Sequence, residues 1–523
     1  MTKSEKLLFS AAKNGDTQTV QTLIKQGVNV NATTPNKWTA LMLAALHGQT
    51  ESVRCLLGHR TKGHRAKRQA ANPYATLKNS AMNAFLLAVR SGNADTVRLL
   101  LDKVSIDINH QSEYELRDDE RYTIMPTPLM FAARYGHTDV MKLLIEKGAD
   151  VSIIDNGGEN ALSLATKHGH IASVRLLFEL GLANANSTDH WETPILTIAS
   201  RNGHKDLVQF LLDNGAEVNR LGGFWGYETA IKDAVFGNHI EIVQLLLDAG
   251  ADVNLGDKIG NLKSNNAYPV LVLYMVCDTY GEKINMDMLK LLLDAGANVN
   301  AMDNLHETAL YKAAENGDID AVRLLLDYGA DVNLGRETPL IAALYDGGEN
   351  TQAKAIVQLL IDNGADVHRC TDIGLWSTVI LAALNHPECL QLLIDAGADI
   401  NYVCRGTTDY YQYTALLWAA EEGITESVKI LLANGADIHA KNKCGRTALD
   451  LAMTEQHTEI VQLLQAAGAK NSENYSPQTA QAEKKKSEEQ QMLEVFQAAF
   501  GAISEHKDEI AKIYQQLFMD KEK

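Results

Sequence analysis

Short apolar runs alternate with polar turns along most of the chain, at a nearly constant interval. The run at 242–247 reads IVQLLL, and an acidic residue and then Gly-Ala-Asp-Val-Asn follow it. Apolar residues at steps of three and four positions form one face of an α-helix. Glycine and short polar residues are typical of a turn. The pattern predicts an amphipathic helix and a turn, and the apolar face of that helix requires a neighbour.

Two series of glycines repeat at the same interval. One glycine follows each leucine-rich run, mostly 33 to 35 residues after the previous one: Gly148, Gly181, Gly215, Gly250, Gly296, Gly329, Gly364, Gly397, Gly435 and Gly468. A second series falls in the middle of the units: Gly15, Gly48, Gly92, Gly136, Gly169, Gly203, Gly237, Gly317 and Gly423. We expect each of the latter to end a first helix in the left-handed conformation. The sequence thus predicts about thirteen helix-turn-helix units that stack, because one unit cannot cover its own apolar face.

Short motifs at the start of the units resemble the ankyrin repeat family. Thr127-Pro128-Leu129-Met130, Thr193-Pro194-Ile195-Leu196 and Thr338-Pro339-Leu340-Ile341 stand where that family has Thr-Pro-Leu-His, with Thr expected as the helix N-cap. The histidine of that tetrad is absent in every unit. The resemblance implies an all-α solenoid with hairpin fingers over residues 1–471, and a role in binding proteins.

Four inserts lengthen the segments between units, near 58–78, 111–123, 257–268 and 404–412. In the family these segments form the projecting fingers. The first insert is basic and contributes the candidate contact residues Arg60, Lys62, Arg65, Lys67 and Arg68. Such a cluster suits an acidic partner, an anionic lipid or nuclear import. A solvated loop with no partner is the alternative.

Aromatic residues are scarce, at 6% of the chain, and several fall close to the start of a unit. We predict a protein-binding role for Trp38, Trp191, Phe224, Trp225, Tyr227, Trp376, Tyr410 and Tyr411, and for Trp418 inside a first helix. Exposed Trp and Tyr are favoured anchors of protein interfaces. Packing of each ring on the adjacent finger is the alternative.

The C-terminal part departs from the repeat. Residues 472–487 are polar and read as a linker, and residues 488–521 form an amphipathic helical tail. Its apolar positions, in part seven residues apart, are Leu493, Phe496, Phe500, Ile503, Ile510, Tyr514 and Leu517. This spacing suits self-association through a coiled coil or a helix bound in a groove of another protein. A helix that folds back on the last repeat is the third possibility.

Charge and composition narrow the function classes. The chain has 523 residues, 48 Lys plus Arg and 66 Asp plus Glu, for a net charge of −18. This balance disfavours broad nucleic-acid binding. Six scattered cysteines give no disulfide framework, and no secretory signal or membrane-spanning run is present in the sequence. A cytoplasmic location is expected, with nuclear entry open.

Catalytic and metal-binding motifs give no support for an enzyme. No Walker, GxSxG, HExxH or paired CxxC motif occurs, and His386 and Cys389 belong to a different end of a unit from Cys370 and Cys404. We predict no cofactor and no metal.

The sequence therefore predicts a non-enzymatic scaffold or adaptor that binds a partner protein. Two alternatives remain. One is a bacterial ankyrin effector acting in a host cytoplasm, since the Glu-rich tail resembles the export signals of such proteins. The other is an enzyme subunit with a site among the inserts. The family also implies that turn asparagines such as Asn254 or Asn333 are hydroxylated in animal cells.

Overall fold

The structure is a computed structural model of the chain. It describes residues 1–58, 71–72, 83–111, 114–115, 123–224, 226–255, 272–278, 283–345, 352–371, 377–403 and 412–472. Its contacts define two compact units. Unit 1 comprises Met1–Val276 and Asn285–Asp303, and unit 2 comprises Cys277–Ile284 and Asn304–Lys523.

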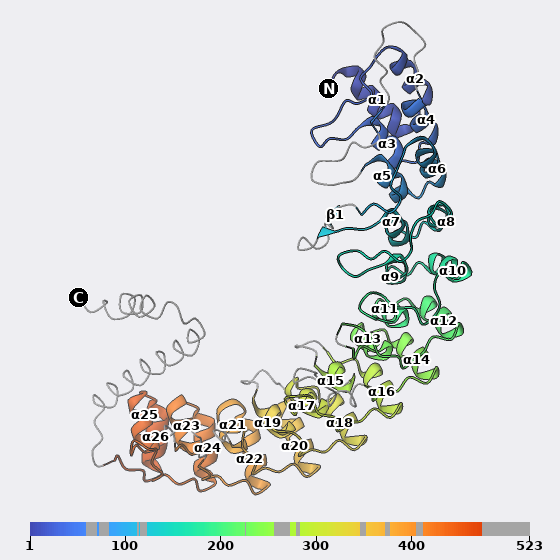
Figure 1. Ribbon diagram of the computed structural model, residues 1–523. Coiled ribbons are helices and arrows are strands. Elements are labelled where there is room, and N and C mark those ends of the chain that lie inside the picture. Colours follow the sequence, from blue (N-terminus) through green and yellow to red (C-terminus); the bar gives the residue numbers. More distant parts are fainter. Residues whose placement is uncertain are drawn as a thin grey trace, which may run out of the picture. The chain divides into compact units, whose positions relative to one another are not determined.

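Helices in consecutive pairs make up both units (Figure 1). Those in residues 1–303 are α1 (Lys3–Asn14), α2 (Thr17–Lys25), α3 (Ala40–Leu46), α4 (Thr50–Gly58), α5 (Ala84–Ser91), α6 (Ala94–Lys103), α7 (Pro128–Arg134), α8 (Thr138–Glu146), α9 (Ala161–Lys167), α10 (Ile171–Glu179), α11 (Ile195–Arg201), α12 (Lys205–Asp213), α13 (Ala230–Phe236), α14 (Ile240–Asp248), α15 (Val272–Cys277) and α16 (Met286–Asp294). Those in residues 304–472 are α17 (Ala309–Glu315), α18 (Ile319–Asp327), α19 (Pro339–Tyr345), α20 (Ala353–Asp362), α21 (Thr378–Asn385), α22 (Pro387–Asp395), α23 (Ala415–Glu422), α24 (Thr425–Ala433), α25 (Ala448–Thr454) and α26 (Thr458–Ala466). The described residues thus hold thirteen pairs of helices, in agreement with the predicted number of about thirteen.

Strands are almost absent from the described residues. β1 (Tyr114–Glu115) pairs antiparallel with β2 (Thr123–Ile124), with Tyr114 opposite Ile124. This hairpin lies at the predicted insert 111–123. Elsewhere the fingers carry single bridges, such as Thr188 with Pro194 and Gly222 with Glu228.

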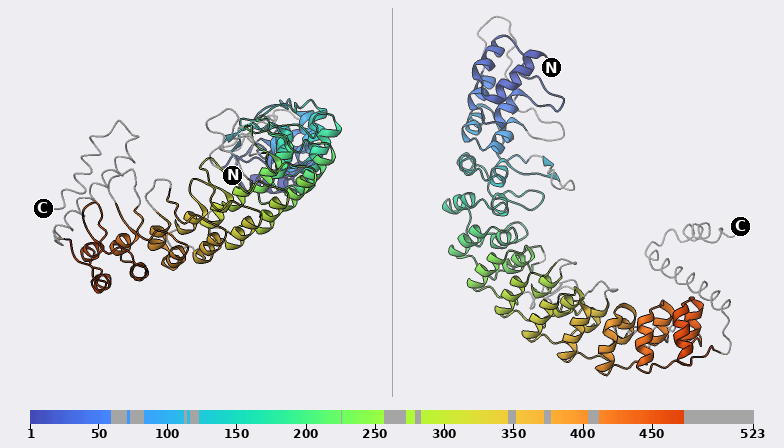
Figure 2. Two further views of the ribbon diagram at one scale, coloured as in Figure 1. Left: turned by 90° about the horizontal axis from the view of Figure 1, so that it is seen from below. Right: turned by 180° about the vertical axis from the view of Figure 1, so that it is seen from behind.

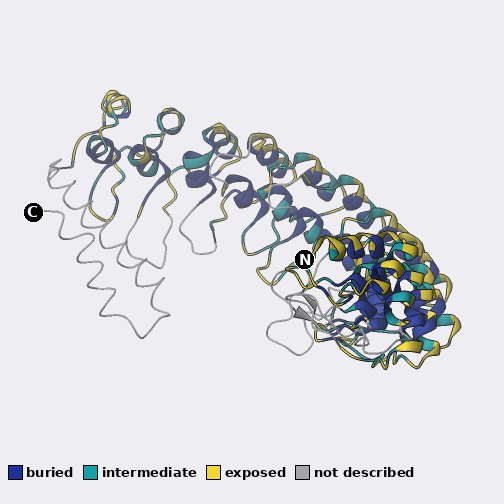
Figure 3. Cartoon of the chain, turned by 90° about the horizontal axis from the view of Figure 1, so that it is seen from above, coloured by how far each residue is buried: buried dark blue, intermediate teal, exposed yellow. Residues whose placement is uncertain are grey.

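Within each unit the first helices of the pairs form one layer and the second helices form another (Figure 2). In unit 1, α1, α3, α5, α7, α9, α11 and α13 pack in sequence, and in unit 2, α17, α19, α21, α23 and α25 do so. The first helices are buried over most of their length, whereas the second helices bury one stripe and expose the other side (Figure 3). On α14 that stripe is Ile242, Val243 and Leu246. The prediction of stacked amphipathic pairs is confirmed.

The local signals work as expected at most units. The side chain of Thr127 accepts a hydrogen bond from the Met130 amide, and Thr308 does the same for Tyr311. All ten glycines that follow the leucine-rich runs have positive φ, between 68° and 93°. An L-residue avoids this conformation, so glycine is required there.

Two local predictions were wrong by one residue. Pro194, rather than Thr193, is the N-cap of α11, because Thr193 is engaged in the preceding finger. Gly237 does not take the left-handed conformation: its φ is −76°, and Asn238 adopts φ 55° in its place. Asparagine is the non-glycine residue that best tolerates this conformation, so the turn moves by one position.

Candidate functional site

The finger at residues 188–194 of unit 1 is a tightly bonded turn. One carboxylate oxygen of Asp189, Oδ1, accepts hydrogen bonds from the amides of Trp191 and Thr193, both at 2.8 Å. Burial raises the pKa of the Asp189 carboxyl above its ordinary value, against the lowering effect of these amide donors. The turn fixes the backbone that presents Trp191.

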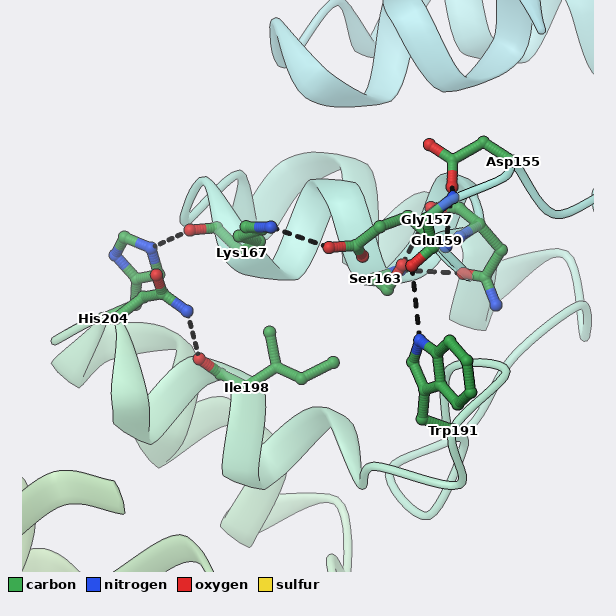
Figure 4. Close-up of polar contacts among 10 residues, drawn as sticks. Asp155, Gly157, Glu159, Ser163, Lys167, Trp191, Ile198 and His204 are labelled. Atoms are coloured by element: carbon green, nitrogen blue, oxygen red, sulfur yellow. Dashed lines mark hydrogen bonds and ion pairs between the residues drawn. The ribbon is translucent and has the colours of Figure 1, made fainter. Parts of the chain in front are cut away.

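Trp191 is held by the preceding finger and is still exposed. Its Nε1 donates to the carbonyl of Gly157 at 3.3 Å (Figure 4). A side chain at Gly158 would place its Cβ 2.3 Å from that Nε1, so the ring occupies a notch that only glycine leaves open. The Gly157 turn is itself fixed, because Asp155 Oδ1 accepts from the amides of Gly157 and Glu159. Trp191 nonetheless remains 40% exposed.

The next finger completes an aromatic pair. Phe224 is 62% exposed, and its ring meets the ring of Trp191 edge-on at 5.0 Å between centroids. The two fingers also touch through backbone: a Cβ at Gly222 would lie 2.3 Å from the carbonyl oxygen of Glu192. We call Trp191 and Phe224 the aromatic tip. It combines a rigid base with exposed aromatic surface.

A charged cluster lies on the first helices of the same repeats. Arg201, at the end of α11, donates through Nη2 to Asp233 at 2.7 Å and to Glu228 at 2.6 Å. Asp233 is only 5% exposed. Burial raises the pKa of its carboxyl to about 6, even though Arg201 acts to lower it. Lys232 lies 4.9 Å from the centre of the half-buried Tyr227 ring, a cation–π contact.

Histidines connect successive repeats of unit 1. The Nε2 of His137, His170, His204 and His239 contacts the carbonyl of Arg90, Arg134, Lys167 and Arg201, respectively, at 2.8 to 3.2 Å. Each ring fills the notch left by the glycine two residues after that carbonyl; at Gly169, a Cβ would lie 2.6 Å from His204 Nδ1. Lys167 also pairs with Glu159 at 2.8 Å, as Figure 4 shows. The basic residues that end these first helices therefore have a fixed backbone.

The structure places the predicted aromatic residues differently from one another. Trp191 and Phe224 come together, whereas Tyr227 is half-buried against Lys232 and Trp38 is half-buried in the first finger. Trp418 packs against the buried Tyr413, with 4.6 Å between ring centroids. Trp225, Trp376, Tyr410 and Tyr411 lie outside the described residues, as do Arg60, Lys62, Arg65, Lys67 and Arg68. So do the tail residues Leu493, Phe496, Phe500, Ile503, Ile510, Tyr514 and Leu517.

The basic residues at the ends of the first helices were not predicted from the sequence. Arg90, Arg134, Lys167 and Arg201 all stand two residues before a mid-unit glycine. Aligning the units on that glycine would have found them. Asp233 was missed as well, although it stands where most units have an apolar residue.

The turn asparagines form a ladder between fingers. Asn254 donates through Nδ2 to the carbonyl of Gly296 at 2.9 Å, and its Oδ1 accepts from the Asn298 amide at 2.7 Å. Asn333 makes the same two contacts with Gly364 and Asp366. Hydroxylation of these side chains stays a prediction.

Neither a metal site nor a membrane-spanning helix is seen where the structure describes the chain. No three His, Cys, Asp or Glu side chains converge as metal ligands in that part. No helix within it has the length and apolar character needed to cross a bilayer. His386 is buried and contacts its neighbour Glu388 at 3.3 Å, and burial raises the pKa of the Cys389 thiol to about 12.

Comparison with known proteins assigns the family. The family model described as "Ankyrin repeats (3 copies)" matches residues 8–112, 115–189, 180–257, 274–371, 349–442 and 379–475. The chain therefore belongs to the ankyrin repeat family. Such repeats indicate a protein–protein interaction domain and are typically non-enzymatic.

Individual relatives share the repeat over part of their length. The chain is 24% identical to ankyrin repeat domain-containing protein SAT10 of Stachybotrys chartarum, over 88% of this chain and 25% of that protein. It is 41% identical to human ankyrin repeat and SOCS box protein 6, over 18% of this chain and 23% of that protein. The crystal structure of the human ASB11 ankyrin repeat domain superposes with a TM-score of 0.38 and 24% identity, covering 47% of this chain and 98% of that one. The chain spans about a quarter of the length of these two curated relatives.

Proposed function

We propose that this chain is a non-enzymatic scaffold that holds a partner protein against the aromatic tip of unit 1. The observation that carries the proposal is the aromatic pair itself. Trp191 and Phe224 are 40% and 62% exposed although they contact each other. Adjacent exposed aromatic rings on a fixed backbone are typical of the energetic centre of a protein interface.

Rigidity of the tip supports the same function. The Asp189 turn, the bond from Trp191 to Gly157 and the close approach of Gly222 to Glu192 all hold the fingers before any partner arrives. A surface that is ordered in advance loses less conformational entropy on binding. The structure therefore favours binding of a folded or extended partner without rearrangement of the fingers.

A photo-crosslinking experiment tests the proposal. A benzophenone amino acid is introduced at Phe224, and separately at Phe236 as a control, since Phe236 is 78% exposed on α13 and not on a finger. We expect a partner protein to crosslink from position 224 and not from position 236. Trp191→Ala should reduce that crosslink, because loss of a central Trp typically costs about 2 kcal/mol of binding, or about 30-fold. Equal crosslinking from both positions would overturn the proposal.

A further inference from the structure

Four consecutive first helices of unit 1, α5 to α11, end in a basic residue at the same position of the repeat, as α1 does with Lys13. Arg90 on α5, Arg134 on α7 and Lys167 on α9 each stand two residues before the glycine of their unit. We call them the basic row. Arg90 and Lys167 are exposed, and Arg134 is half-buried. A run of equivalent positive charges is unexpected on a chain with a net charge of −18.

The basic row is built to a fixed spacing. The carbonyls of its three residues accept hydrogen bonds from His137, His170 and His204 of the following repeats, at 2.8 to 2.9 Å. Each backbone position is thus tied to the next repeat, so the distances between the three charges are set by helix packing. Packed helices lie about 8–10 Å apart.

The charges of the row are available to a ligand. The guanidinium of Arg90 lies over the Tyr135 ring, 5.6 Å from its centre, a geometry that leaves the edge of the group open for a carboxylate. Within the residues that the structure describes, no carboxylate pairs with Arg90 or Arg134. Lys167 has one partner, Glu159, and both side chains are partly exposed, so this pair exchanges readily.

The basic row ends where the equivalent residue is already paired with carboxylates. The next equivalent residue, Arg201, is already committed to Glu228 and to the buried Asp233. Its charge is balanced by these two carboxylates, and a further carboxylate gains little there. Among the first helices α5 to α11, the basic residues open to a further anion are therefore Arg90, Arg134 and Lys167.

The spacing of the row selects a ligand geometry. A polyproline II segment advances about 9 Å per turn of three residues, so every third side chain lies on the same side. We propose that the basic row binds an extended acidic segment of a partner protein, with a carboxylate at about every third residue. This inference rests on the proposed function in that the ligand is a protein, but it uses a different surface from the aromatic tip.

A peptide-binding experiment on the full chain tests the inference. The probe is fluorescein-labelled (Glu-Pro-Pro)5, followed by fluorescence anisotropy, with (Gln-Pro-Pro)5 and a peptide of five consecutive glutamates and ten prolines as controls. We expect the periodic acidic peptide to bind at least tenfold more tightly than either control. Its affinity should fall as salt is raised, because the contacts are ionic.

Matched variants locate the site. The double variant Arg90→Gln/Arg134→Gln should lose at least tenfold in affinity. The double variant Arg98→Gln/Lys142→Gln removes the same charge from exposed positions on the second helices α6 and α8 of the same repeats, and it should stay within about twofold of the original chain. Thermal unfolding of each variant verifies that the repeats remain folded.

Three results would overturn the inference. They are an equal loss in the Arg98 and Lys142 variant, equal binding of the peptide with consecutive glutamates, and tighter binding of a 15-nucleotide single-stranded DNA than of the periodic peptide. The proposed function fails separately: Trp191→Ala/Phe224→Ala should release the partner protein while leaving peptide affinity unchanged. Partner crosslinking that survives while the peptide does not bind would refute the basic row alone.

Discussion

The two units place opposite charges at the same position of their repeats. In unit 1, Asp233 is the fourth residue after the N-cap Thr229 of α13. In unit 2, Lys312 is the fourth residue after the N-cap Thr308 of α17. Most other units have an apolar residue there, such as Leu87, Leu164, Leu381 and Leu451. Asp233 is paired with Arg201, whereas Lys312 faces Asp278, Glu307 and Glu315 at 2.9 to 4.0 Å.

The charged neighbours of each residue decide how far burial shifts its pKa. For Asp233, burial dominates, and the pKa rises to about 6. For Lys312, burial acts to lower the pKa, but the three carboxylates outweigh it and the pKa lies above its ordinary value. One cation partner leaves the buried acid Asp233 poorly compensated, while three anion partners more than compensate the half-buried base Lys312. The same backbone therefore tolerates either sign, at different energetic cost.

The junctions between repeats differ as well. In four consecutive repeats of unit 1, a histidine contacts the carbonyl of a basic residue in the preceding repeat. Among the described residues of unit 2, His457 alone makes this contact, and its carbonyl belongs to Glu421. The comparison teaches that repeats with one architecture can carry different contact surfaces, because the end of the first helix does not take part in the core.

The largest effect is expected where a histidine junction is broken. Gly169→Ala should destabilise α9 to α12 by about 2–4 kcal/mol, from the left-handed backbone and from overlap with the His204 ring. Gly215→Ala has a similar φ, +82°, but its Cβ would meet nothing within 4 Å, so only about 1–2 kcal/mol is expected. Hydrogen exchange of the helix amides measures both. Equal losses would show that the ring contact is unimportant.

A smaller effect should separate Asp233 from Lys312. Lys312→Met leaves three carboxylates without their shared cation and should cost about 2 kcal/mol of unfolding free energy at pH 7. Asp233→Leu restores the apolar residue of other units while Arg201 keeps Glu228, and it should change stability by less than about 1 kcal/mol. Urea unfolding gives both values. A larger loss of unfolding free energy in Asp233→Leu than in Lys312→Met would contradict this difference between the two units.

A pH dependence of stability is expected from Asp233 as well. The pKa of Asp233 is about 6 in the folded chain against an ordinary value of 3.8, so the folded state binds more protons between these values. Its contribution to stability is full below about pH 4 and is lost as the pH rises to about 6. His168 changes stability in the opposite sense, since burial, with Arg134 nearby, lowers its pKa to about 4. Both the original chain and Asp233→Asn contain His168, so the contribution of His168 cancels in the difference between their unfolding free energies. If that difference does not vary with pH, the raised pKa of Asp233 is contradicted.

Much of the fold was predictable because the repeat repeats its local signals. Leucine stripes, capping threonines and the glycines with positive φ specify helices and turns within one unit, and thirteen copies make the pattern unmistakable. The predictions at Thr193 and Gly237 were wrong because the next residue takes the role: Pro194 is the N-cap of α11, and Asn238 adopts the left-handed conformation. Less of the candidate site was predictable: Trp191 and Phe224 were chosen, but so was Trp418, which packs on Tyr413.

The sequence by itself determined the architecture, the length of the unit and the positions of the turns, because each depends on contacts within about 35 residues and on backbone conformations that few residue types adopt. The tertiary structure decided which side chains meet between units: Trp191 on Gly157, Arg201 on Asp233, and the histidines on the carbonyls of the basic row. Those contacts join residues of different repeats, and their energy depends on burial and distance. Neither quantity can be derived from a spacing along the chain, since most repeats have nearly the same spacing and yet differ in these contacts.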